Sequence, residues 1–461
     1  MTQYSISKAC ADFVTDFELS NVSTHTREHA KRLLLDWLGC AIKGASLPQA
    51  EPIRRYITQM GGNPQAQVIG ENTLNSAYHA ALANGYYGHI LEIDDVDKES
   101  ISHPGTVVIP AALSVGEMEQ SSGSSFLAAA IAGYEVMLRV GAAVTPAHYQ
   151  IWHTTATAGA FGSAAAAGRM LSLSREEISW ALGSAGTMSA GLWEFLSDGA
   201  MSKYLHAGKA SATGVMAAVT ARYGLTGASR ILEGEKGFFA GYARQEINGA
   251  IFEDFGTRYR LDTVSFKPYP CCRHTHSAID CAIKLHKACA VTLDEVKSIK
   301  IHTYGAAVQV AGHENPQEER QAQFSLKYVV ATALQKGGIA LDSFLPEALQ
   351  SAQTRTLMKK TTVNVDSGLD QLTPAIWPAK VVVAFADGKE LAALVEYPKG
   401  DPENTLTWEE VISKFEGLVE GLLAKEARRQ VVEMCRAVEE LEKCLEIIEV
   451  VNAHGKFKHY V

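Results

Sequence analysis

The amino-acid sequence predicts a mainly α-helical protein with a large, discontinuous helical domain and a smaller α+β domain. From about residue 5 to residue 256, apolar residues recur at helical spacing and sustained β alternation is scarce. Beyond about residue 261, runs rich in β-branched residues predict strands. After Pro402 the helical spacing returns, so we expect the end of the chain to complete the first domain. The predicted helical domain is 1–265 with 403–461, and the α+β domain is 266–402.

Two segments illustrate the helical pattern of the first part. Thr26–Gly39 places Leu33, Leu34 and Trp37 on one face, and Gly39 is a weak point near the expected helix end. Thr154–Met170 contains three glycines and seven alanines. Because small residues let helices approach closely, we expect this segment at the centre of the domain.

The α+β domain is predicted from alternating strand and helix patterns. Strand patterns cover Val296–Tyr304, Thr362–Asp366 and Lys380–Phe385, and helical patterns cover Ser277–Ala288 and Phe324–Gln335. Asp387-Gly388 lies between two β patterns and is the strongest hairpin signal in the chain. Beyond this domain, helices are expected over Trp408–Leu423 and Ala427–Ile448.

The composition excludes several classes of protein. The chain has 461 residues, of which 47% are hydrophobic and 20% charged, so it can bury a large core and is neither disordered nor a small disulfide scaffold. Its formal net charge of −9, without clustered Lys and Arg, argues against nucleic acid as a partner. Small-molecule chemistry is therefore the expected function.

The same composition predicts a cytoplasmic protein without a membrane partner. No basic region followed by an apolar stretch and a cleavage site is visible at the N-terminus, and the most apolar segments are rich in Ala and Gly. The eight cysteines show no regular spacing, so we expect them to be reduced. The Gly-rich motifs of nucleotide and dinucleotide sites, the His-Glu-x-x-His motif and the Gly-x-Ser-x-Gly motif are missing.

An acidic segment that precedes a His-Pro pair is the first candidate site. Asp94, Asp95 and Asp97 are crowded together, and they repel one another unless a cation, a histidine or a helix N-terminus offsets their charge. A solvated loop between helices explains the same residues. His103-Pro104 leads directly into an apolar run, which favours a functional imidazole at a helix entrance.

Two further clusters come from predicted helix ends. His153 follows a tryptophan, and a histidine of this kind is more often packed than catalytic. Lys203, His206 and Lys209 are spaced so that the first two share a helix face, and we interpret Lys209 as a surface residue.

The segment from Phe266 to His276 has the densest mixture of Cys, His, Lys and Arg. Its cysteines and histidines suggest a metal site, but adjacent ligands close strained rings and a Cys-x2-Cys partner is missing. Prolines on both sides of Tyr269 fix an extended segment instead, which can hold Lys267 and Arg273 toward a bound anion.

These clusters resemble motifs of the MmgE/PrpD family, which includes 2-methylcitrate dehydratases, cis-aconitate decarboxylases and iminodisuccinate epimerases. The resemblance extends over almost the whole chain. It is carried by Leu34–Cys40, Asn84–Gly105, Trp152–Ala165, Lys267–His276 and Phe324–Ala331. Together these motifs are specific, although each alone is weak.

The resemblance implies a fold, a site and a set of roles. The fold is a helical domain with an α+β lid, usually in a homodimer, with the active site in the cleft between the domains and no iron–sulfur cluster, metal or other cofactor. The implied cleft residues are His103, Asp94 with the neighbouring acids, Lys203, Lys267 and His153, which we predict to be catalytic. We further predict that the substrate is bound by Asp95, His206, Arg273, Cys272 and His276. Family members often have Asp in place of Glu92, and the decarboxylases have His near the position of Cys272, so these differences weigh against a decarboxylase.

We therefore predict a cofactor-independent lyase that resembles 2-methylcitrate dehydratase. Dehydration, epimerisation and decarboxylation of such acids all form or quench a carbanion beside a carboxylate, which needs cationic groups together with a base and an acid. An iminodisuccinate epimerase-type isomerase and a cis-aconitate decarboxylase are alternatives within the family. A metal-dependent hydratase that uses the Cys/His cluster, and a non-catalytic carboxylate-binding protein, are alternatives outside it.

Overall fold

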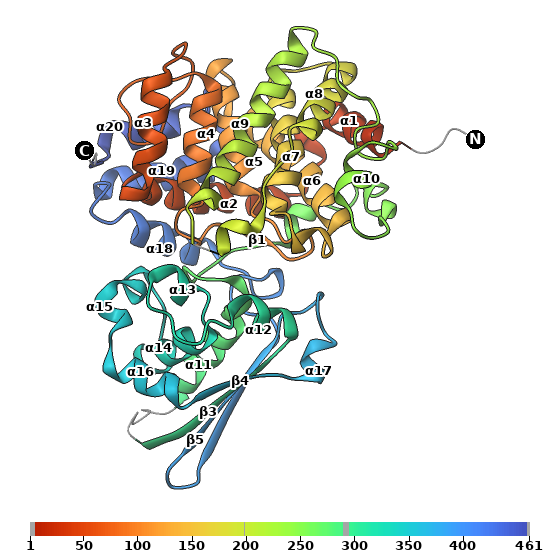
Figure 1. Cartoon of the computed structure of the whole chain (residues 1–461). Coiled ribbons are helices and arrows are strands. Elements are labelled where there is room, and N and C mark those ends of the chain that lie inside the picture. The colour runs from red at the N-terminus through yellow and green to blue at the C-terminus, as the bar shows by residue number, and fades with distance from the viewer. Residues whose placement is uncertain (1–4, 198, 289–294, 459–461) are drawn as a thin grey trace. The chain divides into compact units, whose positions relative to one another are not determined.

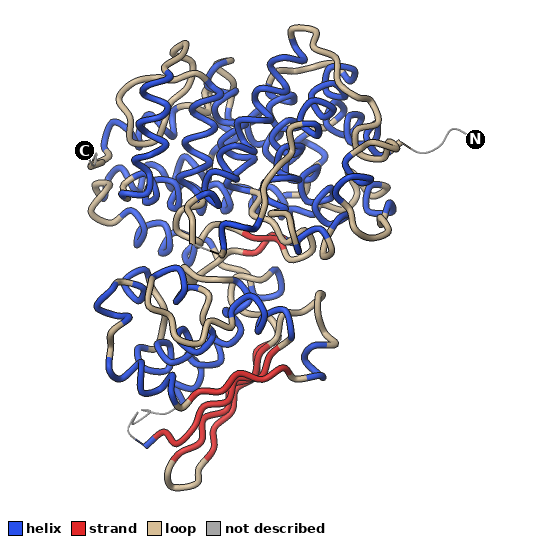
Figure 2. Tube along the Cα trace, in the orientation of Figure 1, coloured by secondary structure: helices blue, strands red, loops and turns tan. Residues whose placement is uncertain are grey.

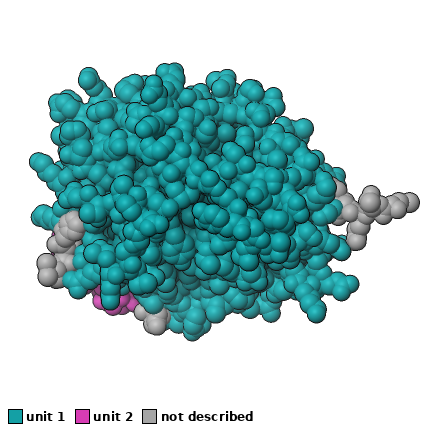
Figure 3. Space-filling view, turned by 90° about the horizontal axis from the view of Figure 1, so that it is seen from above, with its two compact units in different colours: residues 1–264, 407–461 teal, residues 265–406 magenta. Residues whose placement is uncertain are grey.

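The chain forms two compact units in the computed structural model, which describes residues 5–197, 199–288 and 295–458. Unit 1 contains residues 1–264 and 407–461, and unit 2 contains residues 265–406 (Figures 1 and 3). Helices make up most of unit 1, and the longer strands gather in one sheet of unit 2 (Figure 2). The predicted fold class, mainly α with a smaller α+β part, is confirmed.

Unit 1 is a bundle of helices around a small-residue centre. Its helices are α1 (Ile6–Asp16), α2 (Thr24–Ala45), α3 (Glu51–Met60), α4 (Ala77–Gly88), α5 (Gly105–Met118), α6 (Gly123–Val144), α7 (Thr154–Met170), α8 (Arg175–Thr187), α9 (Ser202–Arg222), α10 (Phe238–Tyr242), α18 (Trp408–Val419), α19 (Lys425–Arg436) and α20 (Glu446–His454). Every residue of α7 except Arg169 is buried, and α7 packs against α5, α6, α8 and α9. The predicted central position of this segment is confirmed.

Helix α2 continues past the glycine that was expected to weaken its end. The helix runs to Ala45, and a Cβ atom on Gly39 would lie 3.2 Å from Leu418 and 3.3 Å from Phe415 of α18. Gly39 therefore lets α18 approach α2 closely instead of ending the helix. Lys414 of α18 also donates to the carbonyl of Ile93 at 2.6 Å, which joins the C-terminal segment to the acidic loop.

The helix predicted over residues 427–448 is interrupted, and this part of the prediction was wrong. Helix α19 ends at Arg436, and α20 begins only at Glu446. Between them the backbone turns to pair with the start of α6, where Gly123 donates to Leu441 at 3.0 Å. A Cβ atom on Gly123 would lie 1.8 Å from the carbonyl oxygen of Val438, so the close approach requires glycine.

Helix α6 is long and apolar enough to span a membrane, yet 94% of its apolar window is buried inside the fold. It is therefore a core helix of unit 1.

Unit 2 combines one mixed sheet with helices on one face. Its helices are α11 (His276–Ala288), α12 (Gly305–Ala311), α13 (Glu319–Gln323), α14 (Leu326–Lys336), α15 (Pro346–Leu349), α16 (Ala352–Lys359) and α17 (Ser367–Asp370), and its longer strands are β3 (Val296–Thr303), β4 (Thr361–Val365), β5 (Ala379–Phe385) and β6 (Glu390–Val395). The sheet order is β4-β3-β5-β6, with β3 parallel to β4 and antiparallel to β5. The predicted hairpin joins β5 to β6, and Gly388 has the positive φ of 90° that such a turn requires.

Two short strands and the cysteines complete the description. Strand β1 (Val96–Asp97) lies in the acidic loop, and the chain leaves unit 1 in β2 (Val264–Ser265). The seven cysteines in the described part of the chain are free and buried, as expected for reduced thiols, and Cys289 lies outside that part.

A buried carboxyl group in α5 provides a test of the packing of unit 1. Glu117 accepts a hydrogen bond from the backbone of Gln67 at 2.6 Å, and burial raises the pKa of Glu117 to about 8. The folded state therefore keeps this proton up to about pH 8, whereas the unfolded state loses it near pH 4.5. The protein should lose stability through this group as the pH rises across that interval.

We expect Glu117→Gln to remove this loss of stability. The free energy of unfolding of the variant should exceed that of the wild type by a few kcal/mol more at pH 8 than at pH 5, because one pKa unit corresponds to about 1.4 kcal/mol. Urea unfolding of both proteins at the two pH values measures the difference. Parallel pH dependences would show that Glu117 is ionised in the folded state.

Candidate active site

Four carboxylates are buried within six residues of the loop that follows α4. Glu92, Asp94, Asp95 and Asp97 each expose no more than 4% of their surface. The alternative interpretation of the acidic segment, a loop whose carboxylates face solvent, is therefore excluded for these four side chains. A buried carboxylate needs a partner that offsets its charge, so the contacts of each group determine what it can do.

Asp95 holds the N-terminus of α5. Its side chain accepts from the backbone of Gly105 at 3.0 Å and from the hydroxyl of Tyr134 at 2.9 Å. Burial, with a further contribution from Asp94, raises the pKa of Asp95 well above its usual value, although these hydrogen bonds oppose the shift. Both contacts give Asp95 a structural role, and its predicted contact with substrate stays a prediction.

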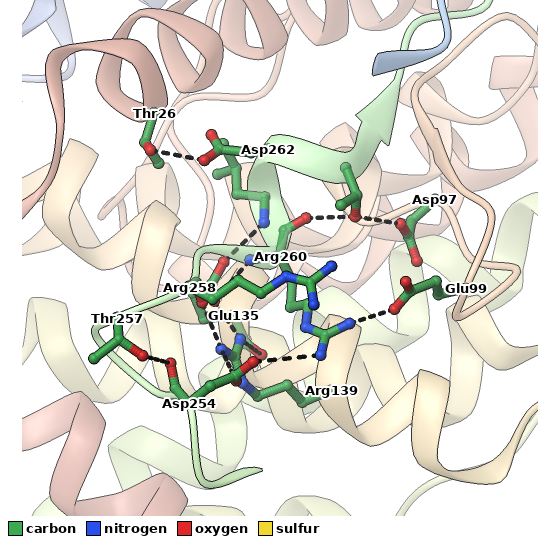
Figure 4. Close-up of polar contacts among 12 residues, drawn as sticks. Thr26, Asp97, Glu99, Glu135, Arg139, Asp254, Thr257, Arg258, Arg260 and Asp262 are labelled. Atoms are coloured by element: carbon green, nitrogen blue, oxygen red, sulfur yellow. Dashed lines mark hydrogen bonds and ion pairs between the residues drawn. The ribbon is translucent and has the colours of Figure 1, made fainter. Parts of the chain in front are cut away.

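Asp97 fixes the far side of the loop. Its side chain accepts from the backbone and hydroxyl of Ser100, both at 2.7 Å, and from the hydroxyl of Thr263 at 2.9 Å. The residues around Thr263 are held in turn by a buried network on α6, in which Arg139 pairs with Glu135 (Figure 4).

The same network extends to the neighbouring residues of the loop. Glu135 accepts from the backbone of Arg260 at 3.1 Å, and the guanidinium of Arg260 pairs with Glu99 (Figure 4). Arg139 also contacts Asp254 at 2.8 Å. Residues 97–99 are thus anchored to α6 through residues 254–263, which restricts the position of the loop that carries Asp94 and His103.

Glu92 forms a buried ion pair with Lys203, which lies in the first turn of α9. Both side chains are 3% exposed. The backbone of Glu92 has φ 56°, an unusual conformation for a residue other than glycine. Such strain persists where surrounding contacts over-determine it, and it is common at functional sites.

Asp94 lies between two histidines. One of its oxygens, Oδ2, is 2.7 Å from Nδ1 of His89 and 3.5 Å from Nδ1 of His103. The nearer partner of His103 Nδ1 is the carbonyl oxygen of Asp95, at 2.7 Å. Because a carbonyl only accepts, Nδ1 of His103 carries the proton and the lone pair is on Nε2. His103 is therefore set up as a base, and its side chain is 12% exposed whereas Asp94 is 1% exposed.

His153 and His206 form a second histidine pair beside this one. Their Nδ1 atoms are 3.2 Å apart, and the ring of His153 is stacked on that of His89 with centroids 5.7 Å apart. Burial, followed by the charge of Lys203, lowers the pKa of His153 well below 6.5. Burial and nearby cationic groups lower that of His206 to about 4. Both rings are therefore neutral near pH 7, so His153 cannot act as a charged acid in the free protein.

The structure thus brings together most of the predicted residues of unit 1. His103, Asp94, His153, His206 and Lys203 lie in one cluster, joined to one another by hydrogen bonds, ring contacts or charge effects. The aromatic ring of Trp193, from the loop before α9, lies 4.7 Å from the ring of His153.

The predicted residues of unit 2 form a separate set of contacts. Arg273 pairs with Asp401, and its other terminal nitrogen is 2.7 Å from Nδ1 of His276. These contacts hold the segment in place, so the predicted roles of Arg273 and His276 in substrate binding stay predictions. Lys267 and Cys272 are buried, and the backbone of Cys272 donates to Gln323 at 2.9 Å.

The Cys/His segment of unit 2 does not assemble ligands around a point. Cys271 contacts the hydroxyl of Thr275 at 3.3 Å, and His274 contacts Tyr304 at 2.7 Å. In the part of the chain that the structure describes, His89, Asp94 and His103 are the group whose potential ligand atoms lie within 4.8 Å of one another, close enough to hold a metal ion. Two imidazoles and a carboxylate suit a divalent transition metal.

His89 is the residue of this site that the sequence analysis missed. It lies at the C-terminal end of α4, is fully buried, and contacts Asp94 directly. The sequence contained a hint of this contact. His89 precedes Asp94 by five residues, and the chain can turn back between them once the helix has ended.

Comparison with known proteins identifies the family. The sequence model of the MmgE/PrpD N-terminal domain matches residues 8–249, and that of the C-terminal domain matches residues 269–439. The chain therefore belongs to the MmgE/PrpD family, as its motifs indicated.

The curated relatives are full-length matches of low identity. The cis-aconitate decarboxylase-like protein oryM of Aspergillus oryzae is 26% identical, and the match covers 97% of this chain and 97% of that protein. Cis-aconitate decarboxylases of Aspergillus terreus and Homo sapiens are 24% and 26% identical, over 96% and 95% of this chain and 95% and 93% of those proteins. The prediction of an enzyme of the lyase class is confirmed.

The buried pair of Glu92 and Lys203 can be tested by a double-mutant cycle. Either Glu92→Gln or Lys203→Met leaves one buried charge without its partner, which typically costs about 3–5 kcal/mol of stability. The double variant should lose clearly less than the sum of the two, as measured by urea unfolding. The exposed pair of Lys8 and Asp12 is the control, and its loss should cost at most about 1 kcal/mol. Additive losses at Glu92 and Lys203 would contradict the ion pair.

Proposed function

We propose that the protein is a lyase that dehydrates a small hydroxylated tricarboxylate, in the manner of a 2-methylcitrate dehydratase. The observation that carries this proposal is the tautomer of His103, whose Nδ1 donates to the carbonyl of Asp95 at 2.7 Å, so that the lone pair of the neutral ring is on Nε2. The family, the lyase relatives and the nearby ammonium of Lys203 support the same chemistry.

In this mechanism His103 removes a proton from the carbon next to a substrate carboxylate. The imidazolium that results lies 3.5 Å from the carboxylate of Asp94, which stabilises its charge. The electron pair left on carbon is delocalised into the substrate carboxylate, and the ammonium of Lys203 offsets that charge.

Loss of water completes the reaction. The electron pair forms the carbon–carbon double bond as the hydroxyl leaves, and the leaving oxygen takes a proton from an acid. Since His153 and His206 are neutral near pH 7, the proposed donor is Lys203, while the histidines hydrogen-bond the substrate. Lys267 is expected to bind a substrate carboxylate, as the resemblance implies.

Decarboxylation of cis-aconitate is the second candidate, and the names of the relatives favour it. In that reaction carbon dioxide leaves, and an acid protonates the carbanion. Cys272 and Glu92, which differ from the residues common in the decarboxylases and the family, favour dehydration.

A single NMR experiment in deuterated water separates the candidates. Citrate, 2-methylcitrate, cis-aconitate and iminodisuccinate are each incubated with the purified protein, with and without a chelator. We expect loss of water from a hydroxylated tricarboxylate, unaffected by the chelator. Release of carbon dioxide from cis-aconitate would establish the second candidate, and deuterium exchange in iminodisuccinate alone would establish an isomerase. Activity that the chelator abolishes would favour a metal-dependent hydratase.

His103→Gln should reduce kcat/KM about a hundredfold or more, because a positioned general base contributes that much or more to the rate. The matched control is His79→Gln, which changes a half-buried histidine that contacts Ser76 and the carbonyl of Gly61. Steady-state kinetics with the substrate found by NMR measures both. A loss of less than about tenfold in His103→Gln would exclude His103 as the base.

A further inference from the structure

His89 is a buried histidine for which the mechanism above has no role. Its ring is fully buried just after the end of α4, and its Nδ1 contacts the carboxylate of Asp94 at 2.7 Å. The ring of His103 lies 4.8 Å away and that of His153 5.7 Å away, measured between centroids. His89 is thus packed among side chains of the site and shielded from solvent.

His89 contacts the oxygen of Asp94 that faces His103. Nδ1 of His89 donates to Oδ2 of Asp94 at 2.7 Å, and this is the same oxygen that lies 3.5 Å from His103. Removal of a donor from a buried carboxylate weakens the hold on its position. Without His89, the oxygen of Asp94 that lies beside His103 would be less firmly placed to stabilise a protonated His103.

The second ring nitrogen of His89, Nε2, also indicates that the contact with Asp94 is the main polar contact of this side chain. Within the described residues Nε2 of His89 has no hydrogen-bond partner, although it is buried. The ring is therefore held by one contact, to Asp94, together with packing against the neighbouring imidazoles. A histidine that only filled space would not need its donor atom to face the carboxylate of the site.

We propose that His89 is a positioning residue that holds the carboxylate of Asp94 in place beside His103. His89, Asp94 and His103 then form a chain in which the buried histidine orients the carboxylate and the carboxylate stabilises the base. This inference rests on the proposed function, because it assigns His89 to the proton transfer at His103.

Two substitutions distinguish this role from simple packing. His89→Asn keeps an N–H donor at the position of Nδ1, whereas His89→Leu keeps apolar volume without a donor. We expect His89→Leu to lower kcat about 10- to 100-fold, the usual effect of removing such a supporting contact, with KM changed less than about threefold. His89→Asn should restore kcat to within about fivefold of the wild type.

His29→Leu is the matched control. His29 is also a buried histidine of unit 1, and its Nε2 contacts the backbone carbonyl of Val264 at 3.0 Å. Its loss should lower stability while kcat stays within about twofold. If His89→Leu does not fold, His89→Gln replaces it, because Gln places its donor at the Nε2 position. Equal kcat for the Asn variant and the donor-less variant, or a loss below about threefold in the latter, would overturn the proposal.

A measurement without substrate separates this proposal from the proposed function. NMR of 15N-histidine-labelled protein follows the titration of His103, assigned with His103→Gln. The titratable side chains near His103 are Asp94, His89 and His153, and Asp94 also interacts with Asp95 and with the ammonium of Lys414. The midpoint should move to lower pH in His89→Leu, because the carboxylate beside His103 is less well placed, and stay unchanged in His89→Asn. An unchanged midpoint in His89→Leu would refute the positioning role even if the enzyme proved to be a dehydratase. A shifted midpoint in an enzyme that dehydrates none of the acids would refute only the proposed reaction.

Discussion

Burial of four carboxylates in one short loop is the constraint on which the rest of unit 1 depends. Each charge would be costly in an apolar interior without a partner, so the surrounding segments must supply a donor or a cation for each carboxylate. Glu92 pairs with Lys203 of α9, and Asp94 contacts His89, which directly follows α4. Asp95 takes the N-terminus of α5 with Tyr134 from α6, and Asp97 takes Ser100 and Thr263.

This division gives the carboxylates different chemical properties. Asp95 and Asp97 accept several hydrogen bonds from donors that cannot transfer a proton near pH 7, so they hold the structure. Glu92 and Asp94 face groups that carry or accept protons, namely Lys203 and the histidines. Only the second pair is therefore suited to support proton transfer, although all four residues are buried to a similar degree.

The sequence predicted the fold class, the position of α7 and the β5–β6 hairpin, because local periodicity and turn residues determine these features. It also predicted that the crowded acids would need a cation, a histidine or a helix N-terminus, and the structure contains all three. It could not predict which acid meets which partner. The partners Lys203, Tyr134 and Thr263 are distant along the chain from the acids they contact, so tertiary packing selects them.

The errors have the same origin. Gly39 was expected to be a weak point near a helix end, but its missing side chain allows the close packing of α18. The break between α19 and α20 follows from a backbone contact with Gly123, more than 300 residues earlier in the chain. His89 was overlooked because its role depends on the helix ending before Asp94, and not on any spacing typical of a motif.

The positions of the cationic groups bear on which of the three reactions the proposed site would favour. Dehydration, decarboxylation and epimerisation share the carbanion next to a carboxylate, so all three need a base such as His103 with Asp94 beside it. They differ in which group leaves, and therefore in how the substrate lies relative to the cationic groups. Glu92 holds Lys203 through a buried ion pair, and its side chain is one methylene longer than that of an aspartate. In the proposed reaction the length of this partner determines where the ammonium lies against the substrate, so the pair of Glu92 and Lys203 is where specificity would change while His103 and Asp94 stay fixed.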